Sequence, residues 1–169
     1  MNAQDVIRGQ LGAAHQFLEA TLADCSPETL AFQGEGWTIN PIAAIYAHIA
    51  MTEDGIINGL VQGKPSLLTQ EGWGEKLGIE DANPTQTPEW AEKHLDVAVV
   101  REYASAVRKA TDEFLASAGD DLLLTTRETP MGEMTTLQMI ANVGVIHVAS
   151  HWGEIAAIKG FQGLKGMAF

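Results

Sequence analysis

The sequence predicts an all-α fold, a four-helix bundle with a long crossover between its second and third helices. Apolar residues recur every three or four positions in four segments, which is the pattern of helices that bury one face. Strict alternation of apolar and polar residues, the pattern of a half-buried strand, is almost absent. Residues 61–96 lack sustained periodicity and separate the second segment from the third. The four periodic segments are residues 3–23, 37–63, 97–118 and 135–160.

The composition is typical of a globular chain with one sizeable core. Hydrophobic residues make up 46% and charged residues 19% of the 169 residues. At this length one core is enough, so we expect a single domain over residues 1–169.

The charge and the single cysteine narrow the classes of function. A formal net charge of −12 disfavours binding to nucleic-acid phosphates and to anionic membranes. The chain has no run of 18 apolar residues and no secretory apolar core near its N-terminus, so we expect a cytoplasmic protein. Cys25 has no second cysteine to pair with, and we expect a partly buried helix-end residue there rather than a reactive thiol.

The first helix spans residues 3–23 and a short helix follows it. His15 lies between polar neighbours and is predicted to be solvated. Ser26, Pro27 and Glu28 are typical of a helix start, so one or two turns are expected before a loop at residues 34–36. The inward positions of the first helix are Ile7, Leu11, Ala14, Leu18 and Leu22.

The second helix begins at the Asn40-Pro41 pair and ends near Gly63 and Pro65. His48 falls about 100° from the centre of its apolar stripe. Small residues on the histidine's own face leave room for a pocket or ligand, or for close packing of two helices. The stripe comprises Ile42, Ile45, Ile49, Ile56 and Leu60, and the small residues are Ala44, Gly55 and Gly59.

The crossover, residues 61–96, is rich in glycine and proline. Loops this long without structure are uncommon, so we expect short helical pieces pinned to the bundle by Trp73 and Trp90. The crossover either covers the mouth of a site or is merely a long connection. His94 is expected to be exposed.

The third helix, residues 97–118, is predicted to end at Gly119 as its C-cap. Its inward positions are Val100, Tyr103, Val107, Ala110 and Phe114. The leucines at 122–124 suit a short strand or an extended packed segment. Pro130 and Gly132 predict a turn, and Thr135 with Gln138 forms a capping-box pattern that starts the last helix.

The last helix carries His147 and His151 four residues apart, and an α-helix places such positions on one face. Two imidazoles on an inward face can supply two ligands of a transition-metal site, and the third ligand must come from another helix. The alternative is a pair of hydrogen-bonded core histidines, because this spacing alone is a weak motif. The same face carries Ile140, Gly144, Ile155 and Ile158.

His48 is the candidate for the third ligand. If the second and fourth helices are neighbours, three neutral imidazoles can meet and hold zinc, nickel or iron. A coordination position would then stay open, which indicates catalysis because structural sites normally have four protein ligands.

Two segments carry a resemblance to a known family. Residues 36–56 and 129–155 resemble the second-helix and last-helix regions of DinB-like (YfiT-like) proteins. The first motif is supplied by Trp37, Thr38, His48 and Glu53. The second, a Thr-Pro-x-Gly turn and a His-x-x-x-His-x-Gly-Glu helix, is supplied by Thr129, Pro130, Gly132, His147, His151, Gly153 and Glu154.

The resemblance implies a metal-binding four-helix bundle, often a homodimer, whose ligands fall on His48, His147 and His151. Relatives include transferases and isomerases that use low-molecular-weight thiols such as bacillithiol or mycothiol. Many relatives carry a further histidine just before the last ligand, where this chain has Ser150. Any role of that imidazole is therefore absent or altered here.

Four other residues near these motifs have competing interpretations. Glu154 could orient a ligand imidazole, accept a proton or bind the metal, or could form a surface salt bridge. Glu53 projects away from His48, which favours packing or capping. The two tryptophans are interpreted as packing residues, Trp37 at the helix entrance and Trp152 away from the site face or at a dimer interface.

Gly144 and Gly153 lie within the last helix, where each costs about 1 kcal/mol relative to alanine. Close approach of another helix, or room for a ligand, would explain them.

These observations favour a metal-dependent enzyme acting on a small molecule, with a thiol-using transferase as the first hypothesis. A metal-dependent hydrolase is the second. The third is a non-catalytic bundle that the metal stabilises. Three histidines suit several metals, so the sequence distinguishes neither the metal nor the substrate.

Overall fold

The computed structural model describes residues 2–79, 95–129 and 132–168, and within them the predicted helical bundle is confirmed. Long helical stretches make up the bundle, and two of them change from α- to π-helical geometry along their length. They are α1 (Ala3–Leu22), α3 (Ile42–Asp54) with η1 (Gly55–Val61), α7 (Val97–Ser117), and α9 (Thr136–Ala141) with η2 (Asn142–His147) and α10 (Val148–Phe161).

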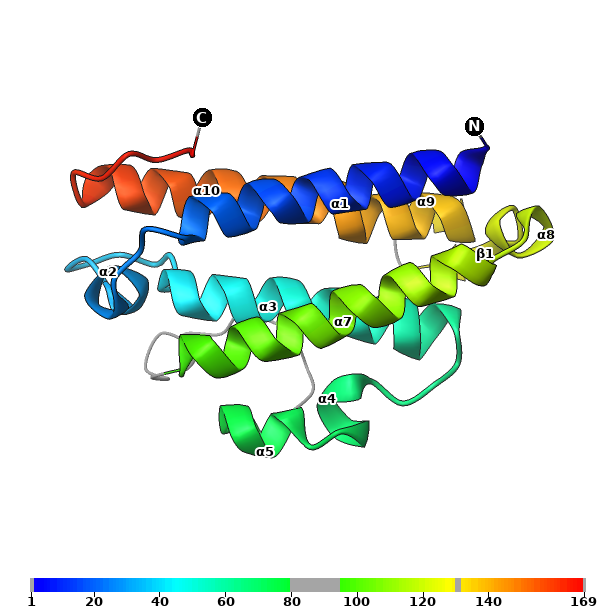
Figure 1. The fold of residues 1–169 in the computed structure, drawn as a ribbon, viewed down its shortest axis with the longest axis horizontal. Helices are drawn as coiled ribbons and strands as arrows, with labels where there is room; N and C mark the ends of the chain where they lie inside the picture. Colours follow the sequence, from blue (N-terminus) through cyan, green and yellow to red (C-terminus); the bar gives the residue numbers. More distant parts are fainter. Residues whose placement is uncertain (1, 80–94, 130–131, 169) are drawn as a thin grey trace.

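The long helices pack as a ring in which α1 contacts α10, α10 contacts α3, α3 contacts α7, and α7 contacts α1. In Figure 1, α1 and α10 run in one direction, and α3 and α7 run in the other. Two parallel helices that follow each other in sequence need a connection as long as the bundle. The predicted long crossover therefore lies between α3–η1 and α7.

Helix starts follow local capping chemistry. Asn2 and Asp5 form a reciprocal capping box at α1, and Thr135 and Gln138 form the predicted one at α9. The second helix differs slightly from the prediction, because Pro41 is the N-cap of α3 and Asn40 lies buried just before it.

The short helices were also predicted. Ser26 caps α2 (Pro27–Ala31), and the crossover contains α4 (Leu67–Gln70) and α5 (Trp73–Leu77). Trp73 is buried and its ring centroid lies 5.9 Å from that of Tyr103 on α7, which pins the crossover to the bundle. Trp90 and His94 lie outside the described residues, so covering of a site by the crossover stays a prediction.

Asp54 fastens the start of the crossover to the bundle. Its carboxylate is fully buried and accepts hydrogen bonds from the backbone N–H groups of Leu67 and Leu68, both at 2.9 Å. It also accepts from Asn58 and from the hydroxyl of Tyr103, both at 2.8 Å. These bonds satisfy the first N–H groups of α4 and balance the cost of burying the charge.

The segment before the last helix corrects two predictions. Ala118, not Gly119, is the C-cap of α7, and Gly119 instead begins α8 (Asp120–Leu123). The leucine triplet is therefore helical rather than extended. Leu123 fills the core while Leu124 is 61% exposed, as expected where a single helical turn lies on the surface.

A hairpin leads into α9. Strands β1 (Thr126–Thr129) and β2 (Gly132–Thr135) pair antiparallel, with Thr126 opposite Thr135. The turn predicted at Pro130 and Gly132 stays a prediction, because residues 130–131 lie outside the described residues. Gly132 has a φ of 103°, a conformation that favours glycine.

The π-helical segment η1 shifts the buried face of the second helix by one residue. Ile57 is fully buried and Val61 is 5% exposed, whereas Leu60, predicted to be inward, is 49% exposed. A π-helical turn holds more residues than an α-helical one, so a 3.6-residue pattern loses phase there. In α7, which is α-helical throughout, Thr111 and Leu115 are buried and the predicted Ala110 and Phe114 are half-buried.

No helix within the described ranges combines the length and the apolar character that crossing a bilayer requires.

Candidate metal centre

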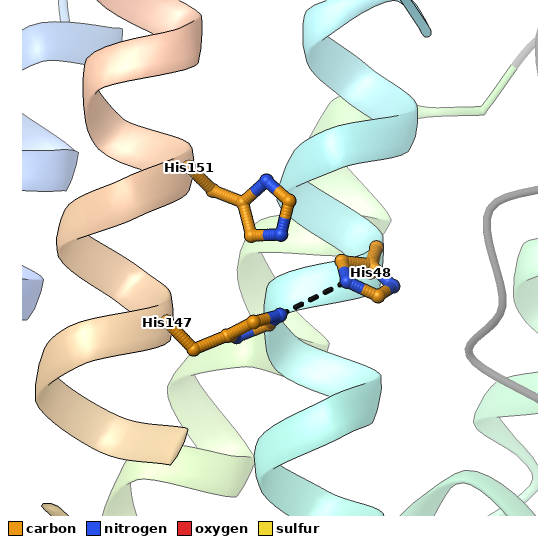
Figure 2. A group of neighbouring side chains, drawn as sticks. All are labelled: His48, His147 and His151. Atoms are coloured by element: carbon orange, nitrogen blue, oxygen red, sulfur yellow. Dashed lines mark hydrogen bonds between the residues drawn. The ribbon is translucent and has the colours of Figure 1, made fainter. Parts of the chain in front are cut away.

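Three histidines converge from two neighbouring helices. His48 lies in the middle of α3, His147 ends η2, and His151 lies in the first turn of α10. Since α3 packs against both η2 and α10, His48 faces the pair from the last helix (Figure 2). As their i,i+4 spacing predicts, His147 and His151 lie on one face, although the helix changes from π- to α-helical geometry between them.

The three rings are close together and steeply inclined to one another. Ring centroids lie 4.9 Å apart for His48 and His147, 4.9 Å for His48 and His151, and 4.5 Å for His147 and His151. The interplanar angles are 60°, 80° and 82°. The rings therefore meet edge to face rather than stacking their faces.

The nitrogen atoms suit a transition metal. One ligand atom from each histidine lies within 4.8 Å of the others. Nε2 of His48 and Nε2 of His147 are 3.0 Å apart, the contact drawn as a dashed line in Figure 2. Two nitrogens on one tetrahedral zinc ion lie roughly 3.3 Å apart, given Zn–N bonds of about 2.0–2.1 Å. The observed distance is close to this value, although it also suits a hydrogen bond between two neutral imidazoles.

Burial keeps His147 neutral but leaves the cluster accessible. All three histidines are half-buried, and the side chain of His151 is 19% exposed. Burial, followed by the nearby His151 and His48, lowers the pKa of His147 to about 4. A neutral imidazole is the form that binds metal, so His147 is available as a ligand across the physiological pH range.

The donor set fits a metal ion held by three imidazole nitrogens. Nε2 of His147 faces His48 in this arrangement, and Nδ1 of His147 is buried with no hydrogen-bond partner among the described residues. Zinc, nickel and ferrous iron all accept imidazole ligands. The three residues therefore form a possible metal site, with the identity of the metal left open by the donor set.

Comparison with known proteins confirms the resemblance that the sequence motifs carry. The family described as the DinB superfamily matches residues 10–155, a range that contains all three histidines. The chain belongs to the DinB superfamily.

A solved structure described as a conserved protein from Enterococcus faecalis shares the fold of this DinB superfamily protein. The TM-score is 0.77 at 18% sequence identity, over 94% of this chain and 96% of the other. At this identity the likeness concerns the fold alone. No curated protein matches the chain.

Glu154 is positioned to orient one member of the cluster in this DinB superfamily protein. Its Oε2 lies 2.6 Å from Nδ1 of His151, and the side chain is 28% exposed. Among the interpretations of Glu154, contact with a candidate ligand imidazole is the one observed. A carboxylate that accepts the Nδ1 proton leaves the Nε2 lone pair of His151 free to bind a metal.

His15 corrects a prediction, because it is buried rather than solvated. It is 9% exposed, and its Nε2 lies 2.8 Å from Oε2 of Glu53. Thr111 donates to the other oxygen of Glu53 at 2.7 Å. His15 follows Leu11 by four residues and precedes Leu18 by three, so it shares their buried face.

Glu53 itself has a packing role, as predicted. It is 1% exposed and pairs with His15 and Thr111 outside the histidine cluster. The pairing of Glu53 with His15 is not predicted from the sequence. A sequence feature that indicates it is the acidic pair Glu53 and Asp54 inside a strongly apolar helix, because buried charges require partners.

The packing residues around the cluster behave largely as predicted. Trp152 points away, stacking on Phe17 at 5.6 Å and donating to the hydroxyl of Thr21 at 2.7 Å. A Cβ on Gly144 would lie 2.8 Å from Leu11, so α1 does approach closely there. Around Gly153, no described atom beyond its chain neighbours and its own helix backbone lies within 4 Å of the corresponding position.

Two other predicted packing residues lie at the far end of the bundle. Trp37 is half-buried and makes edge contacts with Phe32 and Phe161. Cys25 is half-buried at the end of α1, and burial raises the pKa of its thiol, which disfavours a reactive thiolate.

Proposed function

We propose that His48, His147 and His151 bind one divalent transition metal, zinc, nickel or iron, and that the centre serves a transferase using a low-molecular-weight thiol. The observation that carries the proposal is the set of three imidazole ligand atoms within 4.8 Å of one another in a half-buried position. Three protein ligands leave a coordination position for a small molecule, as in catalytic sites.

A metal held by these three histidines would supply Lewis acidity, which would lower the pKa of a thiol substrate. The protein keeps one imidazole neutral and orients another. Burial suppresses protonation of His147, and Glu154 accepts a hydrogen bond from Nδ1–H of His151. The choice of a thiol as the partner follows the resemblance to DinB-like transferases.

Metal analysis tests the centre directly. We expect one divalent metal per chain at pH 7.5, released below about pH 5.5, because protons compete for imidazoles that titrate near pH 6.5 when free. His48→Ala, His147→Ala and His151→Ala should each lower the affinity sharply. His15→Ala, whose Nε2 lies 2.8 Å from Glu53 rather than in the cluster, should not lower the affinity and is the control. The same is expected of His94→Ala. Equal metal affinity in wild type and the triple histidine variant would remove the basis of the proposal.

The thiol hypothesis is tested with the cobalt form of the protein. Thiolate coordination to cobalt gives a charge-transfer band that oxygen and nitrogen ligands do not produce. Titration with bacillithiol, mycothiol and glutathione should produce this band for at least one thiol. Conjugation of that thiol to a generic electrophile should be lost in His151→Ala.

A metal-dependent hydrolase is the second candidate, and the position of Glu154 favours it. Its carboxylate is 28% exposed beside the cluster and could accept a proton from a water molecule. Metal-dependent cleavage of esters or amides without a thiol-induced band would support this function. If metal removal changes only the melting temperature, the third hypothesis, a non-catalytic bundle, is correct. The expected homodimer stays a prediction, to be checked by light scattering of the purified protein.

A further inference from the structure

Two buried side-chain atoms in this protein have no hydrogen-bond partner among the described residues. They are the hydroxyl oxygen of Thr52 and Nδ1 of His147. Buried polar groups in folded proteins are nearly always paired, and the exceptions point to a water, an ion or a functional role. Both atoms belong to the two helices that form the histidine cluster.

Thr52 lies on the cluster side of α3. It follows His48 by four residues, which places it one helical turn further along on nearly the same face. The partner helix runs in the opposite direction, as Figure 1 shows. The turn after His48 is therefore nearer to His147 than to His151.

The orientation of His147 leaves its Nδ1 inside the protein. Nε2 of His147 is turned toward His48, as Figure 2 shows, so Nδ1 occupies the other side of the ring. His151 has the same requirement for its second nitrogen, and Glu154 meets it at 2.6 Å. A histidine that binds a metal through one nitrogen ordinarily donates a hydrogen bond from the other.

We propose that Thr52 is a positioning residue for His147, acting through one water molecule that bridges the hydroxyl and Nδ1. The inference rests on the proposed metal site. Nδ1–H donates to the water and the water donates to the Thr52 oxygen, so both orphan atoms gain a partner. This pairing holds the proton on Nδ1 and leaves the lone pair of Nε2 facing the metal.

Thr52→Val tests the role of the hydroxyl, because it removes the oxygen and nearly keeps the shape. We expect a 10- to 100-fold loss of zinc affinity, the range typical of lost partners of metal-bound histidines. Thr52→Ser should retain affinity close to wild type. The melting temperature of metal-free Thr52→Val should change little, because the loss of a water-mediated hydrogen bond is offset by the smaller cost of burying an apolar group.

Thr136→Val is the matched control. Thr136 is fully buried, and its hydroxyl donates to the carbonyl of Thr125 at 3.3 Å, away from the cluster. This variant should lower the melting temperature of the metal-free protein and leave zinc affinity unchanged. The two threonine variants therefore separate a positioning role from a purely structural one.

The competing outcomes are distinct. If the wild type binds zinc and Thr52→Val binds it equally well, or if Thr52→Ser loses as much affinity as Thr52→Val, the positioning role is wrong and the metal site stands. If the wild type binds no metal, the proposed site fails and this inference fails with it. Should Thr52→Val not fold, nitrogen NMR of the zinc form decides, because a proton on Nε2 of His147 rather than on Nδ1 overturns the inference.

Discussion

The carboxylate of Glu154 lies 2.6 Å from Nδ1 of His151, and both residues belong to the first two turns of α10. The three-residue separation places them on adjoining parts of one helix face. The contact therefore needs no other element of the fold, and it sets the tautomer of an imidazole that the bundle turns toward His48. Local helix geometry orients the ring, and helix packing gives it partners.

Glu154→Gln should weaken metal binding by about 10- to 100-fold, because an amide is a poorer acceptor for the Nδ1 proton of His151. Isothermal titration of metal-free protein with zinc measures the change. Glu102→Gln, on the exposed side of α7, is the control and should bind zinc as the wild type does. Unchanged affinity in Glu154→Gln would show that the contact does not tune the centre.

The metal-free protein should lose stability as the pH falls from about 6.5 to about 4. The pKa of His147 is lowered to about 4 in the folded state, so the unfolded chain binds protons first over this interval. The contribution of His147 to the free energy of unfolding is fully present above the pKa of the unfolded state. It is lost as the pH falls toward the pKa of the folded state. His147→Gln should show a smaller fall in the free energy of unfolding, measured by urea titration at each pH.

His15→Ala should destabilise the protein by about 1–3 kcal/mol, because it leaves the buried carboxylate of Glu53 without one of its partners. Zinc stoichiometry should not change, since His15 is outside the cluster. Urea denaturation and metal analysis of the same preparation give both quantities. A stability equal to that of the wild type would mean that the His15–Glu53 contact contributes little.

Asp54→Asn should cost about 3 kcal/mol, because an amide offers one acceptor oxygen where the buried carboxylate accepts bonds from four groups. Limited proteolysis should also become faster in the crossover, whose first helix Asp54 caps. Asp112→Asn is the control. Its carboxylate forms an exposed pair with Arg8, for which a loss below about 1 kcal/mol is expected.

Gly144→Ala and Gly153→Ala should have opposite effects on the melting temperature. The new methyl group at 144 would meet Leu11 at 2.8 Å, and overpacking of this kind costs about 1–3 kcal/mol. No described atom lies within 4 Å of the position at 153, so helix propensity should dominate and stabilise by up to about 1 kcal/mol. A stabilising Gly144→Ala would contradict the close approach of α1.

Much of this protein follows from the sequence alone, because it depends on interactions between residues a few positions apart. The 3.6-residue periodicity predicts the long helices, and the Thr135–Gln138 pattern predicts the start of the last one. The spacing of His147 and His151 likewise places both on one face before any packing is known. The same local reasoning reaches Glu154, three residues beyond His151.

Only the tertiary structure decides which helix faces meet. Helix α3 lies beside η2 and α10, so His48 lies close to the other two histidines. The residues around His48 in the sequence do not specify this contact. The same packing buries His15 beside Glu53, although the sequence neighbours of His15 are polar. The π-helical turns of η1 rotate Leu60 outward and Ile57 inward. Contacts between distant segments determine these outcomes, because helix periodicity specifies the faces of each helix but not the partner of each face.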